Sequence, residues 1–394
     1  MKQAVVIIPT YNERGNIEKT VDALMDVFKE IKDWKMSILV VDDTSPDKTY
    51  ELVDSLIKKN SRLHLLVNKQ KAGLGGAYMK GMDYAFSKLE ADVVFEFDAD
   101  LSHDPTKIPL FLKSIDKGNQ LVLGSRYIPG GSIPTEWGWY RKFLSVGGNL
   151  IIMTVLTDFK IRDWTSGYRA ITKEVYHAVR PHLDSEQFFG YAFQIGFLYH
   201  ALRQGFKVDP NIAYHFKDRV IGQSKIGPEY IKNTLIFIFK MRIKEIIRHK
   251  IFKFAMVGGT GALVQLVSLE LWRNVAPFQV AFFLAIECAV LSNFLLNNIW
   301  TFSDTQIELK NYPAKFVQFN IASAGSIVIQ QIIAFVGERW IGIHSLFTLP
   351  IIQKVIDTGT VYAIVGILVG MCWNFFAYTK FIWKKPAAPA KVAA

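Results

Sequence analysis

The hydrophobic and polar positions of this 394-residue chain follow two different patterns. Residues 1–125 alternate short apolar runs with amphipathic segments of helical period, which is typical of a mostly parallel α/β sheet. The apolar runs predict strands near residues 4–9, 37–41, 63–67, 93–97 and 120–124. The amphipathic segments predict helices near residues 17–32, 49–59, 74–87 and 106–116.

The last third of the chain is apolar over much longer stretches. They run roughly over residues 251–272, 278–300, 316–340 and 356–378. Each is close to the ~20 residues that a helix needs to cross a bilayer. We therefore expect an integral membrane protein whose membrane domain consists of four helices.

These patterns predict four regions. They are an α/β domain at 1–229, a basic amphipathic interface helix at 230–250, a four-span domain at 251–383 and a disordered tail at 384–394. Within the first region, residues 137–156 are aromatic and apolar with basic residues among them. That segment fits either a core helix or an element on the membrane surface, and its Trp and Tyr content favours the surface.

The membrane part contains a weak internal repeat. Residues 254–265 resemble residues 319–330, and residues 292–302 resemble residues 373–383. The first pair opens a span and the second pair closes one. The repeat predicts a membrane domain built from two similar helical hairpins.

The net charge of +11 indicates membrane topology rather than binding to nucleic acid. Basic residues cluster beside the first span, in the loop between the second and third spans and in the tail, whereas the opposite loops carry few. The positive-inside rule then places the N-terminal domain and the C-terminus in the cytoplasm. The same basic residues suit contact with anionic lipid.

Polar clusters follow three of the predicted strands. They are residues 9–13, Asp42-Asp43 and Asp98-Ala99-Asp100. Ligands of open α/β sheets bind beyond the carboxyl ends of the strands. Two carboxylates two residues apart suit Mg²⁺, which completes its shell with water and substrate phosphates. Asp98 and Asp100 therefore predict a metal site that holds a nucleotide diphosphate.

Eight segments in order resemble the dolichol-phosphate mannose synthases of glycosyltransferase family 2. They are residues 9–16 (PTYNERGN), 40–46 (VVDDTSP), 73–81 (GLGGAYMKG), 98–104 (DADLSHD), 124–131 (GSRYIPGG), 140–145 (YRKFLS), 165–169 (TSGYR) and 218–226 (DRVIGQSKI). The resemblance covers residues 4–230 and implies a Rossmann-like GT-A fold. Residues 250–383 resemble the flippase-like four-span domain that is fused to some members of this group.

The resemblance implies transfer of a hexose from a nucleotide sugar to a polyprenyl or dolichyl phosphate, with Mg²⁺ or Mn²⁺ as cofactor. It implies that Asp98 and Asp100 hold the metal, and that Ser102 stands where the group often has a glutamine ligand. By the same resemblance the nucleotide sugar would contact Pro9, Tyr11, Glu13, Asp42, Asp98, Arg219 and Lys225. The lipid phosphate would contact Arg126, Arg141 and Ser145, with Asp100, Arg126 and Arg141 as the catalytic residues.

Transfer of a sugar to a phosphate acceptor is also chemically reasonable without the resemblance. A phosphate monoester has its second pKa near ~6, so it is a dianion and a competent nucleophile at neutral pH. No general base is then needed, and catalysis reduces to positioning and charge stabilisation. Attack in line with the leaving diphosphate inverts the anomeric carbon.

The residues alone leave several functional hypotheses open. Mannose from GDP-mannose is favoured, and the alternatives are glucose or N-acetylglucosamine from a UDP-sugar. A processive polysaccharide synthase would need a Gln-x-x-Arg-Trp motif, and the one Arg-Trp pair, Arg339-Trp340, lacks that glutamine. A degenerate, non-enzymatic domain is disfavoured because both aspartates and the arginines are present. Whether the membrane domain moves lipid, anchors the enzyme or forms an oligomer is left open.

Overall fold

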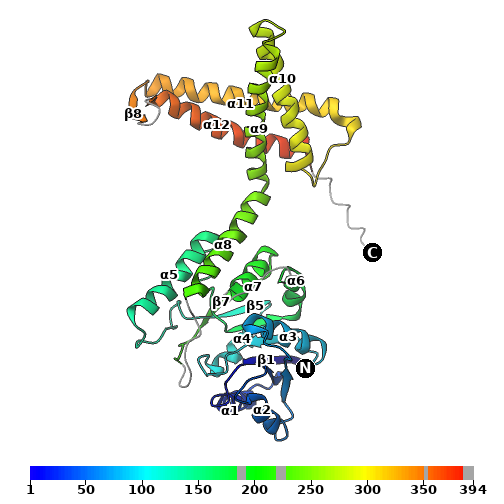
Figure 1. The fold of residues 1–394 in the computed structure, drawn as a ribbon, viewed down its shortest axis with the longest axis vertical. Coiled ribbons are helices and arrows are strands. Elements are labelled where there is room, and N and C mark those ends of the chain that lie inside the picture. Colours follow the sequence, from blue (N-terminus) through cyan, green and yellow to red (C-terminus); the bar gives the residue numbers. More distant parts are fainter. Residues whose placement is uncertain (184–191, 219–227, 350–353, 385–394) are drawn as a thin grey trace. The chain divides into compact units, whose positions relative to one another are not determined.

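The computed structural model describes residues 1–183, 192–218, 228–349 and 354–384. The chain divides into two compact units, Met1–Arg242 and Ile243–Ala394 (Figure 1). The tail that was predicted to be disordered lies almost wholly outside the described residues.

The first unit contains a seven-stranded sheet with the strand order β3-β2-β1-β4-β6-β5-β7. Its strands are β1 (Lys2–Thr10), β2 (Trp34–Asp42), β3 (Leu63–Val67), β4 (Val93–Glu96), β5 (Leu121–Ser125), β6 (Arg169–Thr172) and β7 (Val208–Ala213). All neighbouring strands are parallel except β6, which runs antiparallel to both β4 and β5. The five predicted strands are confirmed, whereas β6 and β7 were not predicted.

Helices cover both faces of this sheet. They are α1 (Ile17–Glu30), α2 (Thr49–Ile57), α3 (Gly73–Ser87), the short η1 (Pro105–Lys107), α4 (Ile108–Asp116), α5 (Trp139–Leu156), α6 (Lys173–Leu183), α7 (Ala192–Arg203) and α8 (Pro228–Arg248). Side chains of β1 alternate between two cores, because successive residues of a strand point to opposite faces. Val5 and Ile7 join the core under α3 and α5 to α8, and Val6 and Ile8 join the core under α1, α2 and α4.

Helix α5 has two different faces. Ile152, Met153 and Leu156 are buried in the core. Trp139 and Phe143 on the same helix are 80% and 66% exposed. The packing of Ile152, Met153 and Leu156 agrees with the core-helix alternative, and the large apolar side chains at the other end of α5 are exposed. Contact of that end with a membrane surface stays a prediction.

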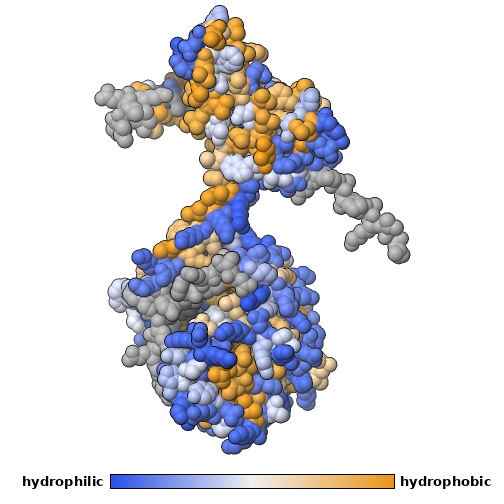
Figure 2. Space-filling view, turned by 45° about the vertical axis from the view of Figure 1, so that its right-hand side comes forward, coloured by the Kyte–Doolittle hydropathy of each residue, from blue (hydrophilic) through white to orange (hydrophobic). Residues whose placement is uncertain are grey.

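The second unit is mainly helical. Its elements are α9 (Lys250–Trp272), α10 (Phe278–Leu296), the π-helix η2 (Asn297–Thr301), η3 (Leu309–Asn311), α11 (Tyr312–Trp340), the strands β8 (Ser345–Leu349) and β9 (Lys354–Asp357), α12 (Thr358–Ala377) and the π-helix η4 (Tyr378–Ile382). Four of its helical segments are long and apolar enough to cross a membrane. Large apolar side chains cover their outer surface, as a membrane domain requires (Figure 2).

The structure supports the predicted repeat in this unit. Helix α9 packs against α10, and α11 packs against α12. The second helix of each pair ends in a five-residue π-helix, at positions that correspond in the repeat. The aromatic residues that follow, Phe302 and Trp383, stack on each other with centroids 4.6 Å apart. The two hairpins thus end in similar structures and join through these two rings.

Candidate active site

Asp98-Ala99-Asp100 begins two residues after the end of β4 at Glu96, at the carboxyl edge of the sheet. Thr20 of α1 donates a 2.6 Å hydrogen bond to the carbonyl oxygen of Ala99, which fixes the backbone between the two aspartates. Ala99 is buried, whereas Asp98 and Asp100 are partly exposed. The loop therefore presents two carboxylates at the surface on a backbone that is held from α1.

These carboxylates are the strongest cation ligands that the loop offers. Among the described residues, no group of three or more His, Cys, Asp or Glu side chains is placed to hold a metal ion. The Ser102 hydroxyl is buried and has no hydrogen-bond partner in the described part of the chain, while its backbone N–H donates to Asp100. Two carboxylates with few further ligands fit a cation that binds together with substrate phosphates.

His103 is buried beside Asp98. Its Nδ1 accepts a 3.2 Å hydrogen bond from the Asp98 backbone N–H, and its ring stacks on Tyr168. Burial lowers the pKa of His103, although the charges of Asp98 and Asp100 oppose this shift. A neutral ring whose Nδ1 is engaged with the backbone orients the Asp98 loop rather than ligating a cation.

The loop after β1 forms the neighbouring part of this edge. Pro9, Tyr11 and Glu13, the predicted nucleotide contacts, are all partly exposed. The Lys71 ammonium lies 3.6 Å from the centre of the Tyr11 ring. Glu13 accepts a 2.8 Å bond from the Asn16 side chain. The loop lies at the same edge of the sheet as the two aspartates, because β1 and β4 are adjacent and parallel.

Asp42 has a different environment from the one predicted for it. It is completely buried at the end of β2. Its carboxylate accepts hydrogen bonds from the Thr10 hydroxyl (2.8 Å), the Ser45 hydroxyl (2.7 Å) and the Ser45 backbone N–H (2.8 Å). These bonds tie the ends of β1 and β2 together. The geometry favours a structural role for Asp42 over the predicted contact with a base or ribose.

The adjacent Asp43 holds the segment that leads into α3. One carboxylate oxygen accepts a bond from the Asn68 side chain, and the other accepts from the backbone N–H groups of Ala72 and Gly73. Gly73 has φ +70°, a conformation that glycine adopts without strain. Asp43 thus shapes the glycine-rich turn next to the nucleotide loops.

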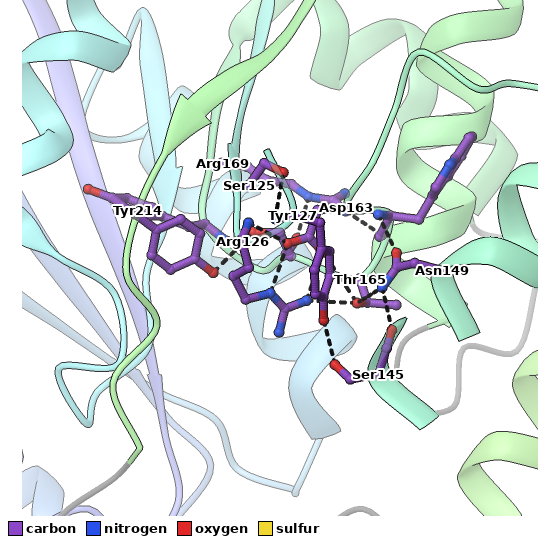
Figure 3. Close-up of polar contacts among 12 residues, drawn as sticks. Ser125, Arg126, Tyr127, Ser145, Asn149, Asp163, Thr165, Arg169 and Tyr214 are labelled. Carbon is purple, nitrogen blue, oxygen red and sulfur yellow. Dashed lines mark hydrogen bonds and ion pairs between the residues drawn. The ribbon is translucent and has the colours of Figure 1, made fainter. Parts of the chain in front are cut away.

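Arg126 follows β5 and forms a buried ion pair with Asp163 (Figure 3). Its Nε and Nη2 donate to the two carboxylate oxygens at 2.8 and 2.7 Å, and Nη2 also donates to Thr165 at 2.9 Å. Burial alone would lower the pKa of Arg126, but the charge and hydrogen bonds of Asp163 raise it well above its usual value. Arg126 is therefore a permanent cation with a fixed orientation.

Ser145, on α5, lies next to this pair. Its hydroxyl is in hydrogen-bond contact with the Tyr127 hydroxyl, and the Arg126 guanidinium lies 5.2 Å from the Tyr127 ring (Figure 3). The structure thus brings together Ser145 and Arg126, two of the three predicted contacts of a lipid phosphate.

Arg141, the third predicted contact, lies at the start of α5. Its guanidinium stacks 3.8 Å above the Trp137 ring and pairs with Asp218 through Nη1 at 3.0 Å and Nη2 at 3.3 Å. Trp137 packs edge-on against Phe216, whose ring also lies below Arg126 at 5.5 Å. Two aromatic rings therefore link the two arginines into one region.

A second buried ion pair joins the neighbouring strands β4 and β6. Arg169 on β6 lies 3.9 Å from Glu96 on β4, and both are fully buried. Arg169 donates to the carbonyl oxygens of Trp164, Ser166 and Gln194. Burial raises the pKa of Glu96 to about 7, in spite of the Arg169 charge. Arg169 thus fixes the backbone of the TSGYR segment rather than facing a ligand.

Two predicted site residues, Arg219 and Lys225, lie outside the described residues. Asp163 and Asn149 were not predicted, although the structure places both around Arg126. Asp163 precedes the TSGYR segment by two residues, and this acid next to a recognised motif was the sequence signal that could have identified it as a site residue.

Both parts of the chain match known families. Residues 5–179 match the family described as glycosyl transferase family 2, and residues 253–383 match the family described as GtrA/DPMS, transmembrane domain. Together with the mixed sheet and the four apolar helices, these matches confirm the predicted GT-A domain with a four-helix membrane domain.

Three characterised proteins are similar to most of one or both units. A dolichol-phosphate mannosyltransferase of Pyrococcus furiosus is 32% identical over 364 residues, which cover 91% of this chain and 97% of the relative. A polyprenol monophosphomannose synthase of Mycolicibacterium smegmatis is 36% identical, covering 62% of this chain and 88% of the relative. An undecaprenyl-phosphate mannosyltransferase of Micrococcus luteus is 34% identical, covering 59% and 91%.

Proposed function

The chain belongs to the dolichol-phosphate mannosyltransferase family, and we propose that it transfers mannose from GDP-mannose to a polyprenyl phosphate with inversion of the anomeric carbon. One observation carries this proposal. His103 connects the two parts of the site: its Nε2 lies 3.7 Å from Asp98 Oδ2, and its ring packs edge-on against Tyr214, whose backbone N–H donates to the carbonyl oxygen of Ser125, the residue before Arg126. The acidic loop suited to a metal-bound diphosphate and the arginine suited to a phosphate are therefore neighbours.

The donor side uses the carboxyl edge of the sheet. Asp98 and Asp100 would hold Mg²⁺ or Mn²⁺, and the Ser102 hydroxyl, for which the described residues provide no hydrogen-bond partner, is a further oxygen on that loop. When bound, the cation would neutralise the charge that develops on the leaving diphosphate. Pro9, Tyr11 and Glu13 would line the nucleotide, since their loop lies beside the two aspartates. Arg219 and Lys225 remain proposed contacts of the donor on the strength of the resemblance alone.

The acceptor side uses Arg126, Arg141 and Ser145. A prenyl phosphate is a dianion at neutral pH, so it can attack without a general base. Arg126 offers a fixed guanidinium, and Arg141 offers an exposed one on an aromatic ring. Together they would orient the attacking oxygen towards the anomeric carbon, which accelerates the reaction by positioning.

Mannose is preferred over other hexoses because the three relatives are named for mannose transfer to, or for synthesis of, a mannosylated prenyl phosphate. The chain is a membrane protein by its family and by its four apolar helices. We propose that the catalytic domain and the C-terminus face the cytoplasm, because basic residues gather at the span ends on that side.

A donor panel tests the proposal. Membranes from cells that overproduce the chain would receive GDP-mannose, UDP-glucose or UDP-N-acetylglucosamine, each with a defined polyprenyl phosphate and with or without EDTA. Transfer from GDP-mannose alone, and its loss in EDTA, is the expected result. Transfer from either UDP-sugar in preference to GDP-mannose would refute the proposed donor.

A further inference from the structure

The Arg126 guanidinium is held on one side by a residue that has no predicted part in the reaction. We propose that Asp163 is a positioning residue for the acceptor: it locks Arg126 so that a single nitrogen, Nη1, faces the phosphate. The proposal rests on the proposed function, because it takes Arg126 as a contact of the lipid phosphate.

Asp163 engages three N–H groups of one residue. Its Oδ2 accepts from the Arg126 backbone N–H at 3.0 Å and from Nε at 2.8 Å, and its Oδ1 accepts from Nη2 at 2.7 Å (Figure 3). The side chains are 7% and 1% exposed. One carboxylate thus fixes both the backbone and the guanidinium plane of Arg126, which leaves the arginine little freedom to change rotamer.

The remaining nitrogen is the one that a ligand can use. Nη2 donates one N–H to Asp163 and the other to Thr165, so both of its N–H groups are engaged. Within the described residues, no hydrogen bond reaches Nη1. A bidentate contact with phosphate would need Nε or Nη2 in addition to Nη1, and that nitrogen would first have to break its bond to Asp163 or Thr165. The geometry therefore favours direct contact through Nη1, and the bidentate contact that arginine often makes with phosphate does not fit Arg126 in this conformation.

Asn149 extends this arrangement to α5. Its Nδ2 donates to Thr165 Oγ1 at 3.2 Å and to the Ser145 carbonyl oxygen at 2.9 Å. Its Oδ1 accepts a 2.8 Å bond from the Trp164 backbone N–H. Helix α5, which carries Ser145 and Arg141, is therefore tied to the same loop that orients Arg126. Asn149 and Thr165 thus connect Ser145 and Arg126, two of the three proposed acceptor contacts, through the loop that carries Asp163.

The charge of the Arg126–Asp163 pair distinguishes two hypotheses: that Asp163 orients Arg126, and that the positive charge of the site alone attracts the phosphate. Arg126 and Asp163 together carry no net charge, so Arg126 contributes direction more than positive potential. Asp163→Asn would make the site more positive by one unit. Attraction alone then predicts tighter phosphate binding, whereas positioning predicts weaker binding, because the asparagine NH₂ cannot accept from the guanidinium.

The test measures binding to the full chain in detergent micelles. A short, water-soluble prenyl phosphate would be titrated by calorimetry into the wild type and Asp163→Asn, and GDP would be titrated into the same preparations. We expect at least about a tenfold loss of affinity for the prenyl phosphate, since losing a hydrogen bond between charged groups costs about that much or more. Affinity for GDP should stay within about twofold.

Three further variants complete the design. Asp83→Asn removes the carboxylate that pairs with Arg180, away from this site, and should leave prenyl phosphate binding unchanged. Arg126→Gln should lose as much affinity as Asp163→Asn, and the double variant should lose no more than either, because Asp163 acts through Arg126. Thr165→Val removes the other partner of Nη2 and should cost about threefold; it serves as the test if Asp163→Asn does not fold.

Each result has a definite meaning. Unchanged or tighter prenyl phosphate binding by folded Asp163→Asn would overturn the positioning role, as would additive losses in the double variant. If Asp163→Asn does not fold, unchanged binding by Thr165→Val would overturn it. A wild type that binds GDP but no prenyl phosphate would overturn the proposed function as well. These outcomes are distinguishable because binding is measured without transfer.

Discussion

At the scale of single residues, both arginines proposed to contact the acceptor pair with an aspartate, but the two pairs differ in exposure. Arg126 and Asp163 are buried, whereas Arg141 and Asp218 are each 43% exposed. An exposed ion pair is worth about 0–1 kcal/mol, and breaking a buried pair by removing one partner costs about 3–5 kcal/mol. We therefore expect an arriving phosphate to replace Asp218 on Arg141 and to leave Asp163 on Arg126.

Asp218→Asn should strengthen prenyl phosphate binding. The Asp218 carboxylate bonds to Nη1 and Nη2 of Arg141, the two groups that a phosphate would use. Removing this competitor should lower the Kd for a short prenyl phosphate by about two- to fivefold, the equivalent of an exposed ion pair. Calorimetry on the full chain measures the change.

Glu136→Gln is the matched control for that variant. Glu136 is an exposed acid next to Trp137, whose ring nitrogen donates to Asp218, and the Glu136 carboxylate accepts a 2.9 Å hydrogen bond from the Thr135 hydroxyl. An equal gain of affinity in both variants would mean that net charge, rather than competition for Arg141, governs binding.

Asp100→Ala should abolish transfer and cation binding together. Loss of one electrostatic stabiliser costs about 10²–10³-fold in kcat, and the diphosphate would also lose much of its counter-ion. Electron paramagnetic resonance of added Mn²⁺ reports binding independently of activity. Asp104→Asn on the same loop, whose carboxylate caps η1, is the control. Activity in EDTA within tenfold of the untreated enzyme would contradict the role of Asp100.

The sequence identifies some of these residues and not others for a physical reason. Asp98 and Asp100 stand out because two acids directly follow an apolar run, which is a local pattern. The pair of Arg126 and Asp163 joins positions 37 residues apart, and the bonds that bury Asp42 join it to Thr10, 32 positions away. No local pattern reveals which acid will be buried against which donor.

At the scale of elements, alternation along the chain locates the first five strands but predicts neither the presence nor the orientation of the sixth. β6 has four residues and lies between β4 and β5, antiparallel to both. Periodicity indicates that a segment is extended and carries no information about its direction. The strand follows the Asp163 loop directly, so this reversal brings the loop to the end of β5, where Arg126 lies.

The repeat in the membrane domain extends to a shared detail. Lys253 on α9 donates to the Trp300 carbonyl oxygen, and Lys315 on α11 donates to the Phe381 carbonyl oxygen. In each hairpin, a lysine of the first helix thus donates a hydrogen bond to a carbonyl oxygen of the π-helix that ends the second helix. A cation at the carbonyl end of a helix is favourable, which accounts for a lysine in both halves.

Gly337→Ala should destabilise the second hairpin. A Cβ there would lie 2.8 Å from the Tyr362 ring, which a hydrogen bond to the Gly342 carbonyl oxygen holds in place. Such overpacking costs about 1–3 kcal/mol. Gly258→Ala is the control, because nothing lies within 4 Å of its added Cβ. A Tm in detergent that falls for Gly258→Ala but not for Gly337→Ala would contradict this packing.

At the scale of the whole molecule, the position of α8 decides where the catalytic domain can be cut. The first compact unit ends at Arg242, within α8. Ile238 and Met241 of this helix are buried in the core of the sheet domain. We therefore propose that the helix expected at 230–250 is part of the folded catalytic domain.

Two truncations test this boundary. A chain ending at residue 250 should fold and bind GDP, because every described donor residue and the whole core remain. A chain ending at residue 229 loses Ile238 and Met241, each worth about 1.5–3 kcal/mol of burial, and should unfold at a lower temperature. Circular dichroism melts give both values, and equal melting temperatures would show that α8 adds nothing to the core.

The central claim is that this chain makes a mannosyl phosphate lipid. The most direct measurement combines the purified full chain with GDP-mannose, Mg²⁺ and a defined polyprenyl phosphate, and analyses the product by mass spectrometry and nuclear magnetic resonance. We expect one hexose added to the lipid phosphate, an equal amount of GDP, and a β-linked mannose from the α-linked donor. A retained α linkage, or no transfer from GDP-mannose to the phosphate, would contradict it.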